Sequence, residues 1–176
     1  ANTSYIIGLA DHRTFVGHVY YGRRVRGQDL RYLLRTGEAP FVPSENERER
    51  CSFYDTFPSE YSGNGVGDYR ESSIAVRTQA GQHAVMPTYV SYEITDQKPE
   101  LPGLPSAFDR ENTAQTLILH CRDEVLQLDV DLYYTVFEEN DMITRSVRIC
   151  NHSKEAVYLM KAYSACLDMD DDGYEM

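Results

Sequence analysis

The chain has 176 residues, a length typical of one domain and long enough to bury a core without disulfides or metals. Its hydrophobic content of 41% predicts a folded chain. Its net charge of −11 disfavours nucleic acid and anionic membrane surfaces as partners. The sequence contains no apolar run long enough to predict a membrane span, and no signal peptide is visible at its start, where Ala1 stands in place of Met.

Alternating apolar and polar residues predict strands along most of the chain. Residues 4–9 and 15–21 flank a polar turn and predict a hairpin. Residues 126–168 predict three strands joined by two short turns, which permit only antiparallel neighbours. Together with strands predicted over residues 72–77, 85–95 and 116–121, the pattern predicts an all-β, twisted antiparallel sandwich of about eight strands.

The strand pattern fails over residues 22–69. Residues 29–35 could form two helical turns, and Gly63, Gly65 and Gly67 follow further along. A connection of this length is rare in a compact domain unless it has a function. Because the segment is rich in aromatic residues, we predict an ordered arm that packs on something outside the domain; a disordered insertion is the alternative.

Metal and phosphate motifs are weak. The five histidines show no ligand spacing, so no metal and no cofactor is predicted. Residues 168–173 resemble the start of a calcium loop but follow a strand, and we expect an acidic connector. Residues 63–67 lack the lysine of a phosphate loop, and a close backbone approach to a partner is expected instead. The four cysteines form no C-x-x-C pair, which predicts buried free thiols in a cytoplasmic protein, with a disulfide as the alternative.

Arg145 lies on the same strand face as Ile143 and Val147 and therefore points toward the apolar side of the sheet. A buried guanidinium needs a partner. Asp129 and Asp131 lie in the neighbouring strand but on its other face, so the sequence does not identify that partner.

Several short segments together resemble a known family, namely Val19-Tyr20-Tyr21-Gly22, Glu60-Tyr61, Gly65-Val66-Gly67-Asp68-Tyr69-Arg70, Leu101-Pro102-Gly103-Leu104-Pro105, Tyr133-Tyr134-Thr135-Val136-Phe137 and Ile143-Thr144-Arg145-Ser146. Their order and spacing resemble the N-terminal domain of glycoside hydrolase family 36 α-galactosidases over essentially the whole chain. The resemblance implies a β-supersandwich related to galactose mutarotase, with residues 1–176 as the N-terminal domain and residues 22–69 as a long arm.

The resemblance also implies a function for the full-length protein. It would be an enzyme, a retaining α-galactosidase acting on terminal α-galactosides such as melibiose and raffinose. Its two catalytic aspartates would lie on a (β/α)8 barrel beyond residue 176. This chain has no Lys-Trp-Asp motif and no Trp at all, so the fragment itself is expected to be non-catalytic. Members of the family are commonly tetramers, in which the arm reaches a neighbouring subunit's active site.

The arm and its C-terminal end supply the candidate contacts to substrate or partner. Arg50 is the first, because a guanidinium fork suits vicinal hydroxyls. Glu38 stands where the family often has Asp. The full set is Arg50, Glu38, Asp55, Asp68 and Arg70, with solvated arm residues as the alternative interpretation.

A free-standing carbohydrate-binding or mutarotase-like sandwich is the other functional hypothesis. A mutarotase needs a His and a Glu at the sugar's anomeric centre, and the scattered histidines do not suggest such a pair. A lectin module would normally expose Trp, which is absent.

Overall fold

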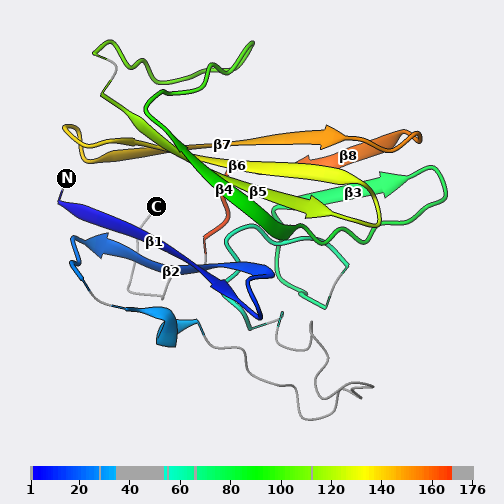
Figure 1. Cartoon of the computed structure of the whole chain (residues 1–176). Helices are drawn as coiled ribbons and strands as arrows, with labels where there is room; N and C mark the ends of the chain where they lie inside the picture. The colour runs from blue at the N-terminus through cyan, green and yellow to red at the C-terminus, as the bar shows by residue number, and fades with distance from the viewer. Residues whose placement is uncertain are drawn as a thin grey trace.

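A computed structural model of the chain describes residues 2–27, 29–34, 54, 56–65, 67–111 and 113–167. Over these ranges the fold is built from strands, with a single turn of 3-10 helix, which confirms the predicted all-β class (Figure 1). The elements in chain order are β1 (Thr3–Ala10), β2 (Phe15–Arg23), η1 (Arg31–Leu33), β3 (Ile74–Thr78), β4 (Thr88–Thr95), β5 (Gln115–Asp123), β6 (Leu128–Phe137), β7 (Met142–Asn151) and β8 (Val157–Ala162).

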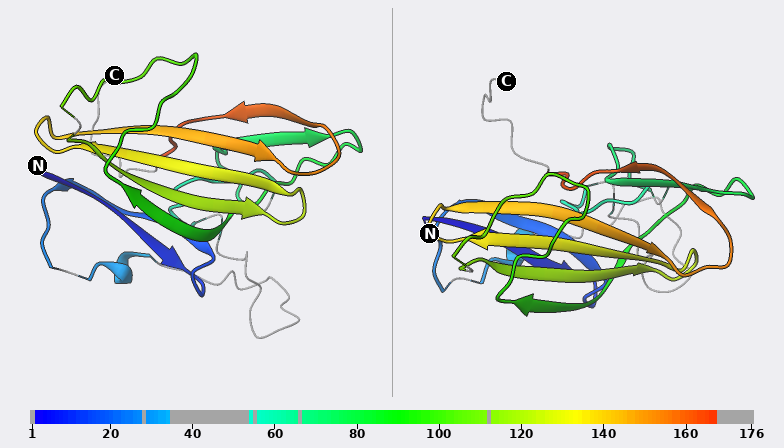
Figure 2. Two further views of the ribbon diagram at one scale, coloured as in Figure 1. Left: turned by 45° about the horizontal axis from the view of Figure 1, so that its top comes forward. Right: turned by 90° about the horizontal axis from the view of Figure 1, so that it is seen from above.

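The strands form three antiparallel sheets. β1 pairs with β2, β3 pairs with β8, and β4 to β7 form a four-stranded meander in chain order. Figure 2 shows the β1–β2 hairpin lying across one face of the meander. Because side chains alternate along a strand, one face of each layer can be apolar, and these two faces enclose the core.

The main core lies between the hairpin and the meander. Tyr5, Ile7 and Leu9 of β1 pack against a buried cluster that includes residues of β5 and β6. Leu132 of β6 is 1% exposed and Val130 is 0% exposed. Core side chains in this cluster are Val16, Tyr61, Ile74, Val76, Val85, Leu119, Cys121, Leu126, Leu128, Val130, Leu132 and Tyr134. We call this side of the meander its inner face.

The predicted three-stranded meander over residues 126–168 is wrong in its last strand. β8 pairs with β3 rather than with β7, and Leu159 lies opposite Val76. The side chain of Asn151 accepts a hydrogen bond from the Ser153 amide at 2.9 Å and donates one to the Glu155 carbonyl at 2.9 Å. These bonds shape a turn after which the chain joins a different sheet. Strand alternation predicts β8 but carries no information about which strand it will pair with.

The helix expected over residues 29–35 is reduced to η1. The Asp29 carboxylate accepts a hydrogen bond from the Arg31 amide at 3.1 Å and pairs with its guanidinium at 2.6 Å. These contacts lower the pKa of Asp29 to about 2. A side chain that bonds its own backbone two residues ahead favours a turn over a longer helix. Among the described residues there is no helix long and apolar enough to cross a membrane.

Candidate functional site: the roots of the arm

Within the arm, the described residues on either side of residues 35–53 pack on the β1–β2 hairpin, on its face turned away from the meander. The first root ends at Leu34 and the second begins at Tyr54, with residues 35–53 between them. We use the term arm roots for Leu34, the first root, and for Tyr54 and Phe57, the second. Their shared seat means that one rigid element holds both ends of the arm.

A pair of glycines makes this seat. Gly8 and Gly17 lie opposite each other in the hairpin register. A Cβ on Gly8 would fall 2.5 Å from Leu34 Cδ1, and a Cβ on Gly17 would fall 2.6 Å from Leu34 Cδ2 and 2.7 Å from Phe57 Cζ. Two bare backbone positions therefore create the space into which the two roots pack.

A second apolar cluster completes the seat. Phe15 and Tyr54 meet edge to face with ring centroids 5.2 Å apart, and Phe57 is 0% exposed. Leu34 and Met86 pack against this cluster. Burying a side chain such as Phe57 contributes about 1.5–3 kcal/mol, so the second root is part of the fold rather than a loose attachment.

From Phe57 the chain runs between the layers of the sandwich. The His18 amide donates to the Pro58 carbonyl at 2.7 Å, and the Glu60 amide donates to the Val16 carbonyl at 3.0 Å. This pairing makes residues 58–60 an added strand-like segment along β2. We call residues 58–62 the through-segment, because it connects the arm roots to the core.

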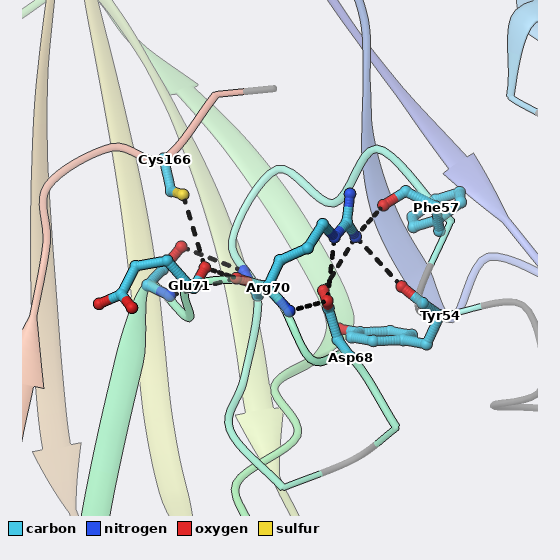
Figure 3. A network of polar contacts seen from close by, with 8 residues as sticks. Tyr54, Phe57, Asp68, Arg70, Glu71 and Cys166 are labelled. Atoms are coloured by element: carbon cyan, nitrogen blue, oxygen red, sulfur yellow. Dashed lines mark hydrogen bonds and ion pairs between the residues drawn. The ribbon is translucent and has the colours of Figure 1, made fainter. Parts of the chain in front are cut away.

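Asp68 and Arg70 brace the second root (Figure 3). The Asp68 carboxylate accepts hydrogen bonds from Arg70 Nε at 2.9 Å and Nη2 at 2.9 Å, and its side chain is 2% exposed. Arg70 Nη2 also donates to the carbonyls of Tyr54 at 3.2 Å and Phe57 at 2.6 Å. The Asp68–Arg70 pair therefore ties the backbone of the second arm root, at Tyr54 and Phe57, to the chain just before β3.

The structure describes two of the five residues predicted to contact substrate or a partner. Asp68 and Arg70 are brought together, while Arg50, Glu38 and Asp55 lie outside the described residues. The contact role of all five stays a prediction. The close backbone approach expected at residues 63–67 occurs within the domain, because a Cβ on Gly63 would lie 1.8 Å from the Val85 carbonyl oxygen.

Glu60 is the partner of Arg145 that the sequence did not identify. Arg145 Nη1 lies 2.8 Å from Glu60 Oε1, and the Glu60 side chain is 0% exposed. The hydroxyls of Tyr5 and Tyr134 donate to the same oxygen at 2.6 and 2.9 Å. Arg145 also lies 4.5 Å from the Tyr134 ring centroid, within cation–π range. The apolar face of Arg145 was the one signal in the sequence for this cluster.

His18 adds a histidine to this cluster. Its Nδ1 lies 3.4 Å from Glu60 Oε2, so the structure does contain the His–Glu pair that the sequence did not suggest. The Glu60 carboxylate is enclosed and paired with Arg145, which leaves it no access to a sugar. Burial first, and then the Glu60 charge, raise the pKa of the Tyr5 and Tyr134 hydroxyls. The arrangement fits a structural tie rather than acid–base chemistry.

The described part of the chain also bears on the metal-binding and cysteine predictions. Within it, no group of three or more His, Cys, Asp or Glu side chains could hold a metal ion. Cys121, Cys150 and Cys166 are free thiols, but of these three only Cys121 is buried, so the predicted burial is wrong for Cys150 and Cys166. Burial raises the pKa of Cys121 to about 12. Cys51 and the calcium-like segment 168–173 lie outside the described residues.

Gly17→Ala should loosen the arm roots. The added methyl meets Leu34 and Phe57 at distances that force both to shift, and overpacking of this kind costs about 1–3 kcal/mol. Denaturant unfolding gives the loss of stability, and limited proteolysis should show faster cleavage next to the roots. Gly22→Ala is the matched control, because its Cβ meets only the end of the Tyr20 side chain. Equal effects of the two variants would show that the glycine seat does not hold the arm.

Glu60→Gln should destabilise the chain strongly. The amide keeps the shape of the side chain but leaves Arg145 as an uncompensated buried cation, which typically costs about 3–5 kcal/mol. Chemical denaturation measures the change. Glu71→Gln is the control, because Glu71 pairs with Lys161 at the surface, where removal of a charge has little effect. A loss for Glu60→Gln no greater than that of the control would contradict the proposed role of the pair.

Alkaline pH should unfold the chain. Tyr5, Tyr61 and Tyr134 have pKa values raised above the ordinary 10.0, chiefly by burial. Below pH 10 these phenols are protonated in both states, so their contribution to stability is fully present; above pH 10 the unfolded state loses protons first and stability falls. We expect Tm to decrease above pH 10, with part of the phenolate absorbance of the 14 tyrosines appearing only on unfolding. Free titration of every tyrosine with unchanged Tm would refute this.

Comparison with known proteins identifies the family and agrees with the fold. The glycosyl hydrolase family 36 N-terminal domain matches residues 14–176. Alpha-galactosidase Mel36A of Lactobacillus acidophilus is 37% identical over 98% of this chain and 24% of its own length. The bifunctional alpha-galactosidase/sucrose kinase AgaSK of Mediterraneibacter gnavus is 36% identical over 96% of this chain and 18% of its own. The chain thus spans about a quarter or less of these relatives.

Solved structures give the same result. The alpha-galactosidase AgaA of Geobacillus stearothermophilus, in complex with raffinose, superposes with a TM-score of 0.83 at 30% identity, over 93% of this chain and 23% of that one. The galactosidase domain of AgaSK superposes with a TM-score of 0.85 at 36% identity, over 95% of this chain and 23% of that one. A match over nearly the whole chain, in both sequence and fold, places this protein in the glycosyl hydrolase family 36 N-terminal domain family.

Proposed function

We propose that the full-length protein is a retaining α-galactosidase that hydrolyses terminal α-galactosides of the melibiose and raffinose type, with this chain as its N-terminal accessory and oligomerisation domain. The α-galactosidase relatives support the activity, and the complexes of AgaA with raffinose and with stachyose support the substrate class. We place the protein in the cytoplasm, where free thiols such as those at Cys121 and Cys150 persist.

Catalysis belongs, in this proposal, to the part of the protein outside this chain. Retaining glycosidases need two carboxyl groups on either side of one glycosidic bond, about 5–5.5 Å apart. We assign both to a (β/α)8 barrel that adjoins this domain. Among the described residues the most enclosed carboxylate is that of Glu60, and its pairing with Arg145 argues against a role in catalysis. No cofactor is needed for this chemistry.

The arm carries the contribution of this domain. The single observation that supports this role is that both arm roots are fixed on the hairpin, at the Gly8–Gly17 seat. A segment held at two fixed points loses less conformational entropy on binding than a free chain. We propose that the arm contacts the galactoside site of a neighbouring subunit in a homotetramer, through Glu38 and Arg50 of residues 35–53 and through Asp55, while Asp68 and Arg70 hold the second root in place.

The free-standing mutarotase-like alternative has less support. One observation favours it, the His18–Glu60 pair. A mutarotase needs these groups open to a sugar, whereas the side chains of His18 and Glu60 are 11% and 0% exposed. The pair is therefore better explained as part of the ion-pair cluster.

Arg50→Ala in the full-length protein should raise KM for raffinose at least about tenfold, the effect of losing one charged hydrogen bond. Arg48→Ala is the matched control two residues away and should change KM less than about twofold. Steady-state kinetics measure both, and size-exclusion chromatography with light scattering gives the oligomeric state. Full-length protein without α-galactosidase activity would refute the proposed function. Equal KM values for the two variants would refute the role of Arg50 alone.

A further inference from the structure

An open pocket lies between the meander and the loop that joins β4 to β5. The described part of this loop, residues 96–111 and 113–114, lies on the side of the meander opposite the β1–β2 hairpin, which we call the outer face (Figure 1). The pocket has a volume of about 460 Å³, and we call it the outer pocket. The sheet contributes Tyr133, Ser146 and Arg148 to its lining, and the loop contributes Pro99, Glu100 and Leu101 among others.

Strand register places the polar groups of the outer pocket on one face of the sheet. In the antiparallel pairing of β6 with β7, Tyr133 lies opposite Ser146 and Asp131 lies opposite Arg148. Residues directly opposite each other share a face, and the buried Leu132 between Asp131 and Tyr133 belongs to the core on the inner face. The phenol, the hydroxyl and the guanidinium are therefore all presented on the outer face.

A series of polar contacts orients the Arg148 guanidinium. The pKa of Arg148 is raised, first by a hydrogen bond with Tyr133 and further by the nearby charge of Asp131. Asp131 is itself held in place, because its Oδ1 lies 2.7 Å from His120 Nδ1 on the next strand. A guanidinium presents five N–H donors in one plane, and neighbours that fix this plane also fix the direction of the donors. Such a group suits adjacent hydroxyls of a sugar.

The loop that forms the other side of the outer pocket is anchored at both ends. Near its start, Thr116 Oγ1 donates a hydrogen bond to the Gln97 carbonyl at 2.8 Å. Near its end, the Asp109 carboxylate accepts hydrogen bonds from the amides of Thr113 and Ala114, each at 3.1 Å. Long loops inside a compact domain usually have a function, and ligand sites are usually preformed. A long loop fixed in this way meets both conditions.

The lining of the outer pocket indicates the class of its ligand. Pro99 and Leu101 offer apolar surface, whereas Glu100 on the loop and Arg148 on the sheet carry opposite charges. Because these charges balance, the pocket gives little net attraction for a phosphate or a metal ion. A sugar matches both kinds of surface, since its C–H face is apolar and its hydroxyls donate and accept hydrogen bonds. The volume also lies within the range of about 300–1,000 Å³ that is typical of small-molecule sites.

We infer that the outer pocket binds a neutral oligosaccharide. Arg148 and Glu100 bond its hydroxyls, and Pro99 and Leu101 lie against a ring face. The ring of Tyr133, which is partly exposed in the pocket, adds aromatic contact surface. The inference goes beyond the proposed function, which assigns sugar contacts to the arm. Raffinose serves as the probe, and only that choice of sugar rests on the proposed function.

Photo-crosslinking maps the site directly. The full-length protein is illuminated with a raffinose analogue that carries a diazirine, and labelled peptides are identified by mass spectrometry. We expect label in the peptides that contain residues 99–102 and 146–148, and excess unlabelled raffinose should remove it. Arg148→Ala should reduce this label at least about tenfold, the effect of losing a charged hydrogen bond. Arg122→Ala should change it less than about twofold; Arg122 is the matched control because it pairs with Asp129 on the same face, outside the pocket.

A filling substitution gives an independent check that leaves Arg148 in place. Ser146→Phe puts a ring into the outer pocket and should reduce the label there at least about tenfold, because the sugar no longer fits. Thr144→Phe is the control, since Thr144 lies on the same face of β7 two residues earlier and does not line the pocket. It should change the label less than about twofold.

Absence of label from the outer pocket of the full-length protein would overturn the inference, as would label that Arg148→Ala and Ser146→Phe leave unchanged. Stronger competition by trigalacturonate than by raffinose at equal concentration would also overturn it, because the ligand would then be an anion. α-Galactosidase activity of the same preparation is measured in parallel. Activity without label in the pocket rejects the inference alone, whereas label in a protein without activity rejects the proposed function alone.

Discussion

The buried ion pair between Glu60 and Arg145 is the interaction on which the arrangement of the layers depends. Arg145 belongs to β7, Glu60 to the through-segment, and the tyrosines that share the carboxylate to β1 and β6. One carboxylate therefore links the hairpin, the through-segment and the meander. A buried pair adds little net stability over an apolar replacement, but breaking it is costly, so its main effect is to specify register.

That register determines where the arm rejoins the domain. If the through-segment slipped by one residue, Glu60 would turn away from Arg145 and Tyr61 would leave the core. Phe57, three residues earlier, would then miss the Gly8–Gly17 seat. The core and the arm roots are in this way specified together. The same alternation along β1 that turns Tyr5, Ile7 and Leu9 toward the meander turns Gly8 toward the roots.

The strands could be predicted from the sequence because alternation is a local signal. The hairpin, β5, β6 and β7 were found within a few residues of their ends. The pairing of β8 with β3 and of Arg145 with Glu60 could not be predicted, because each joins segments far apart in the chain. The same holds for the hydrogen bond from Tyr134 to Glu60, whose residues are 74 positions apart. The arm was recognised only as a failure of the pattern. Its glycine seat became visible once the β1–β2 register placed Gly8 beside Gly17.

Because they share one ion-pair cluster and one seat, we expect the arm roots and the through-segment to unfold together with the sandwich core. Native-state hydrogen exchange tests it most directly, by comparing the amides of His18 and Glu60, which bind Pro58 and Val16 across the through-segment, with amides of β6. We expect both groups of amides to exchange with the same free energy of opening, equal to that of global unfolding. Exchange of the His18 and Glu60 amides at rates near those of an unfolded peptide, while β6 stays protected, would contradict it.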